Sequence, residues 1–136
     1  MKANYQVTNT KSFVLTNVNG KIDLNAGMNI FAGVMSLLKS GNQNRVLIDG
    51  RHSKTFFTLP DICHFLEQLS VYNDLPKNKI AVILPKQFDN DLARFFEVTA
   101  EGRGLKIKLF FDNFEAAVKW LMNKNSHPEY YHYLKN

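Results

Sequence analysis

Two short apolar runs constrain the fold more than any other feature of this sequence. They cover residues 45–50 and 79–84, and Pro85 follows the second run directly. Short runs that are apolar on both sides are typical of strands buried in the middle of a parallel sheet. Since neighbouring parallel strands need a crossover of a dozen or more residues, we expect a helix in the segment between the two runs.

Four segments carry the spacing of three and four residues that places apolar side chains on one face of a helix. Thr58 stands at the N-cap position of the second segment, with Pro60 and Asp61 in its first turn. Asp112 is followed three residues later by Glu115, which predicts a capping box for the last helix. The expected helices cover residues 23–40, 59–72 and 89–101, with the last beginning at Asp112.

The N-terminal segment reads as an antiparallel hairpin. Residues 4–9 and 12–18 are short and rich in β-branched and aromatic side chains, with a tight turn near Thr10 and Lys11. Asn19-Gly20 is expected to end the second strand. The polar edge at residues 4–9 is a candidate surface for a homodimer, although its polar side chains equally suit an edge that resists pairing.

The order of elements predicts the fold class. After the leading antiparallel hairpin, strands and helices alternate strictly up to a last strand at residues 106–111. The predicted order is β-β-α-β-α-β-α-β-α, an α/β fold with a mixed, mostly parallel five-stranded sheet and four helices. We expect one domain over residues 1–124, followed by an aromatic C-terminal tail at residues 125–136.

Composition narrows the classes of function. The chain has 136 residues, with 17 Lys and Arg against 12 Asp and Glu, a net charge of +5. The basic residues do not cluster as a nucleic-acid patch would, so no nucleic-acid partner is expected. Cys63 is the single cysteine, which excludes an internal disulfide and a zinc site built on cysteines.

Hydropathy predicts the location of the chain. No run approaches the roughly 20 apolar residues that a membrane helix needs, so no membrane insertion is expected. The polar N-terminus lacks the apolar centre of a signal peptide. We therefore expect a cytoplasmic protein.

Three stretches carry a resemblance to a known family. They are Val46–Arg51, Phe95–Gly104 and Lys108–Leu121, the last a strand followed by a helix with Glu-Ala and Trp-Leu. Over roughly residues 4–123 the chain resembles the STAS domains, named for sulfate transporters and anti-sigma factor antagonists. It looks closest to the small stand-alone bacterial branch.

The resemblance implies a non-enzymatic module. Anti-sigma factor antagonists bind a kinase partner and are switched by phosphorylation of a Ser or Thr at the start of the second helix. Relatives of similar shape bind nucleotides or apolar ligands such as lipids. The corresponding region here is Phe57–Asp61, which lacks the usual Asp-Ser pair and carries Thr58 as its one hydroxyl.

The residues themselves point to a binding edge. In open α/β sheets, ligands gather where the strands reach their carboxyl ends. Gly50 lets a ligand approach the backbone closely, and Arg51 and Lys86 are suited to an anion. The alternative is an ordinary solvated loop in which Asp49 braces a turn. The candidate partner- or ligand-binding residues are Asp49, Gly50, Arg51, His52, Ser53, Thr58 and Lys86.

No catalytic residue, metal site or cofactor is predicted. Ser53 and His52 are adjacent in sequence, and such a pair rarely forms a nucleophile and its base. The leading hypothesis is a regulatory or protein-interaction module of STAS type with a protein partner. The alternative is a carrier of a small apolar, lipid-like or anionic nucleotide ligand, in a pocket lined by some of the eleven phenylalanines. An enzyme acting on an anionic substrate at the same edge is a third, weaker hypothesis.

Overall fold

The computed structural model describes residues 2–41, 43–72 and 77–123. The predicted tail at residues 125–136 therefore lies outside the described residues. The strands are β1 (Asn4–Asn9), β2 (Val14–Ile22), β3 (Arg45–Thr55), β4 (Lys79–Leu84) and β5 (Lys106–Phe111). The helices are α1 (Leu24–Gly41), α2 (Leu59–Leu69), α3 (Asn90–Gly102) and α4 (Phe114–Met122). Among the described helices, none combines the length and apolar character needed to cross a membrane.

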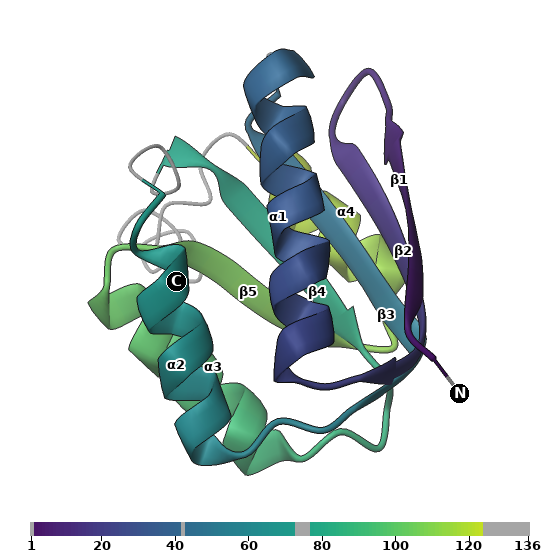
Figure 1. The fold of residues 1–136 in the computed structure, drawn as a ribbon. Coiled ribbons are helices and arrows are strands. Elements are labelled where there is room, and N and C mark those ends of the chain that lie inside the picture. The colour runs from purple at the N-terminus through teal and green to yellow at the C-terminus, as the bar shows by residue number, and fades with distance from the viewer. Residues whose placement is uncertain (1, 42, 73–76, 124–136) are drawn as a thin grey trace, which may run out of the picture.

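The five strands form one sheet in the order β1-β2-β3-β4-β5. β1 pairs antiparallel with β2, and every later pair is parallel. This confirms the predicted fold class. Each parallel strand is added on the same side of the one before it, so right-handed crossovers place their helices on one common face. Figure 1 shows α1, α2 and α3 in front of the sheet, as that rule requires.

The opposite face of the sheet is covered by α4, which lies behind the sheet in Figure 1. Leu47, Ala81 and Ile83 of the central strands pack there against Ala117 and Leu121, and all five are 0% exposed. A larger apolar cluster lies on the other face, between the sheet and the three crossover helices. The sheet is therefore buried on both faces at its centre, which explains the continuous apolar runs of β3 and β4.

The strands β2 and β3 are both longer than predicted. β2 does not end at Asn19-Gly20 but continues to Ile22, and β3 continues beyond Gly50 to Thr55. The two extensions pair with each other in parallel. Gly20 has a φ of +87°, a conformation that glycine adopts without a steric penalty.

The pairing of β2 with β3 contains a bulge. Asn17 lies opposite Asp49 and Asn19 lies opposite His52, so two steps along β2 match three along β3. A bulge of this kind shifts the alternation of side chains between the two faces of the sheet. As a result, Ser53 lies on the same face as Gly50 rather than on the opposite one.

Two helix boundaries differ from prediction. The N-cap of α4 is Asn113, whose side chain accepts a hydrogen bond of 3.0 Å from the backbone N–H of Ala116. The predicted cap, Asp112, instead has a φ of +48° and turns the chain into the helix. Aspartate tolerates this left-handed conformation better than most residues. The helix α2 ends at Leu69 rather than Tyr72.

The outer edge of β5 is partly closed by a side chain from α3. A Glu97 carboxylate oxygen accepts a hydrogen bond of 2.7 Å from the backbone N–H of Leu109. An edge strand otherwise presents unpaired N–H groups to solvent. Glu97 therefore satisfies one of these groups.

Candidate binding site at the carboxyl edge of the sheet

Asp49 and Arg51 form a bidentate ion pair at the end of the regular part of β3. The Arg51 Nη2 and Nε atoms lie 2.8 and 2.9 Å from the two Asp49 carboxylate oxygens. The Arg51 backbone N–H also donates to Asp49, at 3.2 Å. The Arg51 guanidinium lies 5.2 Å from the centre of the Phe114 ring. Both residues are thus held on the α4 side of the sheet.

The ion pair shifts the pKa of both residues toward their charged forms. Burial alone raises the pKa of the Asp49 carboxyl, but hydrogen bonds from Arg51 and the nearby charges of Arg51 and His52 outweigh it and lower the pKa below its usual value. The hydrogen bond to Asp49 raises the pKa of Arg51 further. The lowered pKa favours the ionised form of the Asp49 carboxyl. Arg51, which was predicted to bind an anion, is instead paired with Asp49.

Gly50 and Ser53 lie on the opposite face, toward α1 and α2. The Ser53 hydroxyl is buried and donates a hydrogen bond of 2.7 Å to the Gly50 carbonyl oxygen. A Cβ atom at Gly50 would lie 3.0 Å from the Ile83 carbonyl oxygen. A side chain at this position would press on the backbone of β4, so Gly50 has a structural role here.

His52 and Lys86 are both exposed. Since Ser53 is buried and bonded to Gly50, the structure does not align its hydroxyl with the His52 ring as a nucleophile and base would be. Among the described residues, no cluster of three His, Cys, Asp or Glu side chains is suited to hold a metal ion. The structure therefore does not gather the predicted edge residues into one site. Some lie on the α4 face of the sheet, some on the opposite face, and the others are exposed to solvent.

The start of α2 is the most sharply defined part of this edge. The Thr58 hydroxyl accepts a hydrogen bond of 3.2 Å from the Asp61 backbone N–H, and the Asp61 carboxylate accepts one of 3.0 Å from the Thr58 N–H. This reciprocal pair is a capping box, so the predicted N-cap is confirmed. Thr58 is exposed, and its neighbours Phe56 and Leu59 are 52% and 49% exposed.

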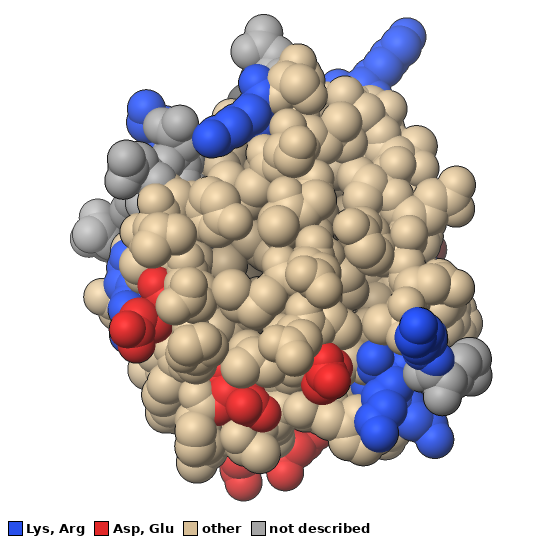
Figure 2. All heavy atoms as spheres, in the orientation of Figure 1, with Lys and Arg blue, Asp and Glu red and all other residues tan. Residues whose placement is uncertain are grey.

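Lysines border these exposed apolar side chains. Lys21 and Lys54 are register partners on β2 and β3, and both are exposed. The Lys21 ammonium lies 5.0 Å from the centre of the Phe56 ring. Figure 2 shows blue Lys and Arg side chains gathered at the lower right, near the ends of β2 and β3 in Figure 1. We call Lys21, Lys54, Phe56, Thr58 and Leu59 the β3–α2 surface.

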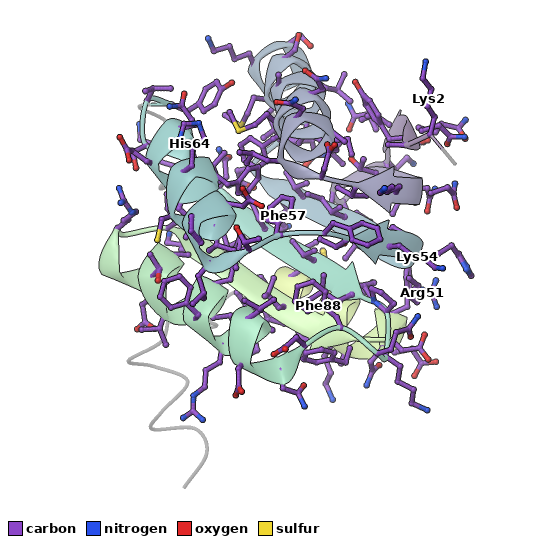
Figure 3. The ribbon with its side chains drawn as sticks, turned by 60° about the horizontal axis from the view of Figure 1, so that its bottom comes forward. Lys2, Arg51, Lys54, Phe57, His64 and Phe88 are labelled. Carbon is purple, nitrogen blue, oxygen red and sulfur yellow. The ribbon has the colours of Figure 1, made fainter. Side chains whose placement is uncertain are left out.

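An apolar cavity lies behind this surface, between the sheet and the three crossover helices. Its volume is about 120 Å³. The sheet contributes its floor, including Ile48, Val82 and Leu109, and the helices contribute its roof. Phe57 and Phe88 line it from the loops after β3 and β4, and Figure 3 labels both rings in a view onto the edge where these loops lie.

The sequence did not single out Phe56 and Leu59 as exposed apolar side chains, and it offered a pocket lined by phenylalanines only as an alternative. The adjacent pair Phe56-Phe57 carried one available signal. An apolar residue directly before an N-cap often packs on the helix, which is the position of Phe57 and not of Phe56. The phenylalanines could not decide between a pocket and a filled core, because their count is the same in both cases.

Comparison with known proteins identifies the fold. No protein-family model matches the chain, and neither does any curated protein sequence. Several solved structures do match. An uncharacterised protein of the DUF3478 family from Shewanella loihica, with a SpoIIAA-like fold, is 16% identical over 88% of this chain and 93% of its own, with a TM-score of 0.53.

The anti-sigma factor antagonist SpoIIAA is also similar. Its unphosphorylated form is 10% identical over 85% of this chain and 96% of its own, with a TM-score of 0.54. Its phosphorylated form, described as a Bacillus cell fate determinant, is 12% identical over 85% and 97%, with a TM-score of 0.50. This chain has the SpoIIAA-like fold. The STAS-like architecture expected from the sequence is thereby confirmed, and identities this low establish the fold alone.

Proposed function

We propose that this chain is a regulatory protein-interaction module without catalytic activity, which docks a protein partner through the β3–α2 surface. The observation that carries the proposal is the pair of large exposed apolar side chains, Phe56 and Leu59, on either side of the rigid start of α2. Apolar side chains held on ordered backbone are well suited to anchor an interface, because little conformational freedom is lost on binding.

The charges around the two apolar side chains indicate the chemistry of the partner. The Lys21 ammonium lies beside the Phe56 ring, and Lys54 is the register partner of Lys21 on β3. A partner that places an apolar side chain between Phe56 and Leu59 and carboxylates opposite the lysines would be complementary. The likeness to SpoIIAA supports a partner of protein type, since that protein is an anti-sigma factor antagonist.

The edge residues predicted from the sequence contribute unequally to this proposal. Thr58 belongs to the surface itself, and His52 and Lys86 are exposed on the segments that end β3 and follow β4. Asp49 and Arg51 are expected to maintain the shape of the strand end rather than to contact the partner, because each already satisfies the other.

The proposal is tested by comparing two double variants during isolation of native complexes. Phe56→Ser with Leu59→Ser removes the apolar part of the surface. Val71→Ser with Val98→Ser is the matched control, because these side chains are 69% and 62% exposed and lie outside the surface. The partner isolated with the wild type is then purified, and its affinity for each form is measured by titration calorimetry.

We expect the control to bind as the wild type does and the surface variant to bind at least tenfold more weakly, as hot-spot residues do. Circular dichroism should show both variants folded, because all four side chains are exposed. Equal affinity of the surface variant and the wild type would contradict the proposal, as would an equal loss in both variants.

A further inference from the structure

The face of the sheet under the three crossover helices is packed unevenly, since Val46 and Ile80 are 0% and 2% exposed but the next residues along the same face are not fully buried. Beneath α4, Leu47, Ala81 and Ile83 are each 0% exposed. On the other face of the same strands, Ile48 and Val82 lie under three helices but are only half-buried. In a well-packed domain, the central residues of both faces lose their accessible surface. Ile48 and Val82 line the floor of the apolar cavity, which accounts for the surface that they leave accessible.

The size of the cavity fits a small molecule. Its volume is about 120 Å³. A cavity of about 150 Å³ lined by Leu, Ile and Phe excludes water and binds benzene or xenon. The cavity in this chain is comparable, so one aromatic ring or a short alkyl chain is the largest occupant that it takes without repacking.

The lining of the cavity determines the chemistry of the occupant. Among the described residues that line it, none is charged, and Ser53 and Thr55 contribute the side-chain hydroxyls. The Ser53 hydroxyl already donates its hydrogen to the Gly50 carbonyl oxygen. A charged group placed in this cavity would lose its hydration without gaining a partner, which is strongly unfavourable.

The cavity reaches the edge of the sheet at which the β3–α2 surface lies. Phe57 and Phe88 line it from this edge and come from two different loops (Figure 3). The Phe57 ring packs closely on α1: a Cβ atom at Gly27 would lie 2.9 Å from it. Access therefore depends on loop residues, which move more readily than the sheet or the helices.

We propose that this cavity is a binding site for a small, uncharged, apolar molecule of the size of one aromatic ring or a short alkyl chain. The site is separate from the β3–α2 surface, because its lining is internal and Phe56 and Leu59 do not contribute to it.

The test uses benzene as the probe and methyl-labelled full-length protein observed by NMR. The methyl groups of Ile48, Val82 and Leu109 line the cavity, and those of Leu47, Ile83 and Leu121 on the opposite face are the internal control. We expect saturable shifts at the lining methyl groups and none at the control groups. Benzoate, which has the same ring and a negative charge, should bind at least tenfold more weakly.

Val82→Phe places a ring in the centre of the floor and should abolish the benzene shifts. Leu109→Phe, on the neighbouring strand, is a second blocking variant in case the first does not fold. Three results would overturn the proposal: no saturable shift at the lining methyl groups, equal shifts on both faces, or benzoate binding as tightly as benzene. Benzene binding that persists in a folded blocking variant would overturn it as well.

Discussion

Asp49 shows how a buried charge is tolerated at the end of a central strand. Its carboxylate is 6% exposed and receives three hydrogen bonds, all from Arg51. A buried carboxylate is strongly unfavourable unless it is paired and hydrogen-bonded. Arg51 is therefore expected to matter for stability rather than for contact with a partner.

Replacing Arg51 by Met should destabilise the fold by about 2–3 kcal/mol at neutral pH, because the Asp49 carboxylate stays buried and keeps only the backbone N–H of residue 51 as a donor. The wild-type pKa of Asp49 is lowered below 3.8, so its stabilising contribution is present above that pH and is lost as the pH falls through the lowered value. In the variant, only the backbone N–H of residue 51 and the charge of His52 still oppose the effect of burial, so the pKa of Asp49 is higher than in the wild type. The difference in unfolding free energy should therefore shrink as the pH falls from the pKa of the variant to the lower pKa of the wild type.

Urea unfolding at pH 7 and at pH 3.5 measures this difference. The double variant Asp49→Asn with Arg51→Met is the control, and it should recover a large part of the loss because the unpaired charge is gone. A penalty that does not change with pH would show that the ion pair is not its cause.

Thr16 presents the opposite case, a buried hydroxyl with no hydrogen-bond partner among the described residues. It is 0% exposed in the middle of β2. Replacement by Val keeps the shape of the side chain and removes the unsatisfied group, so we expect a gain of about 1 kcal/mol in the free energy of unfolding. Urea unfolding measures it.

Thr8→Val on the exposed strand β1 is the matched control, and its effect should stay within about 0.5 kcal/mol. A loss of stability in Thr16→Val would mean that the hydroxyl is bonded in solution.

The helix α2 begins where the proposed docking surface lies, and its capping box fixes that start. Thr58→Ala removes the hydroxyl that accepts from the Asp61 N–H and should cost about 1 kcal/mol. Thr58→Ser keeps the cap and should cost little. Thermal unfolding of both variants checks this, and an alanine variant as stable as the serine variant would contradict it.

The same two variants distinguish a capping role of Thr58 from a direct contact with the partner. If Thr58 acts only by holding the start of α2, the serine variant should bind the partner as the wild type does.

Strands and helices differ in how far the sequence determines them. The apolar cores of β3 and β4 and the spacing of the helices depend on local pattern, so they could be predicted. The extension of β3 from Arg51 to Thr55 could not, because its polar residues resemble a loop and are ordered only by pairing with β2. The bulge depends on the same pairing, and it divides Asp49 and Arg51 from Ser53.

The arrangement of the whole molecule follows from one topological fact. Strands added in one direction place three crossover helices on one face and leave α4 to cover the other. The sequence predicted the order of elements along the chain, including the leading hairpin, but not the order of the strands in the sheet. It could not predict that the three crossover helices leave a cavity of about 120 Å³ above the sheet, because packing of this kind depends on helix positions rather than on composition.

Both proposed sites meet at the segment between β3 and α2. Phe56 and Leu59 face solvent, whereas Phe57 between them lines the cavity. The domain therefore places its two candidate binding features at the edge where strands end and helices begin, as is general for open α/β sheets. The predicted homodimer through β1 remains a prediction, and β1 is an exposed edge strand of the sheet.

Hydrogen–deuterium exchange of the chain, free and bound to its isolated partner, tests the docking proposal most directly. The account predicts slower exchange on binding at residues 54–64, which include most of the β3–α2 surface and the first turns of α2, with no change in α3 at residues 90–102. Protection confined to α3, to β1 or to α4, with residues 54–64 unchanged, would contradict it.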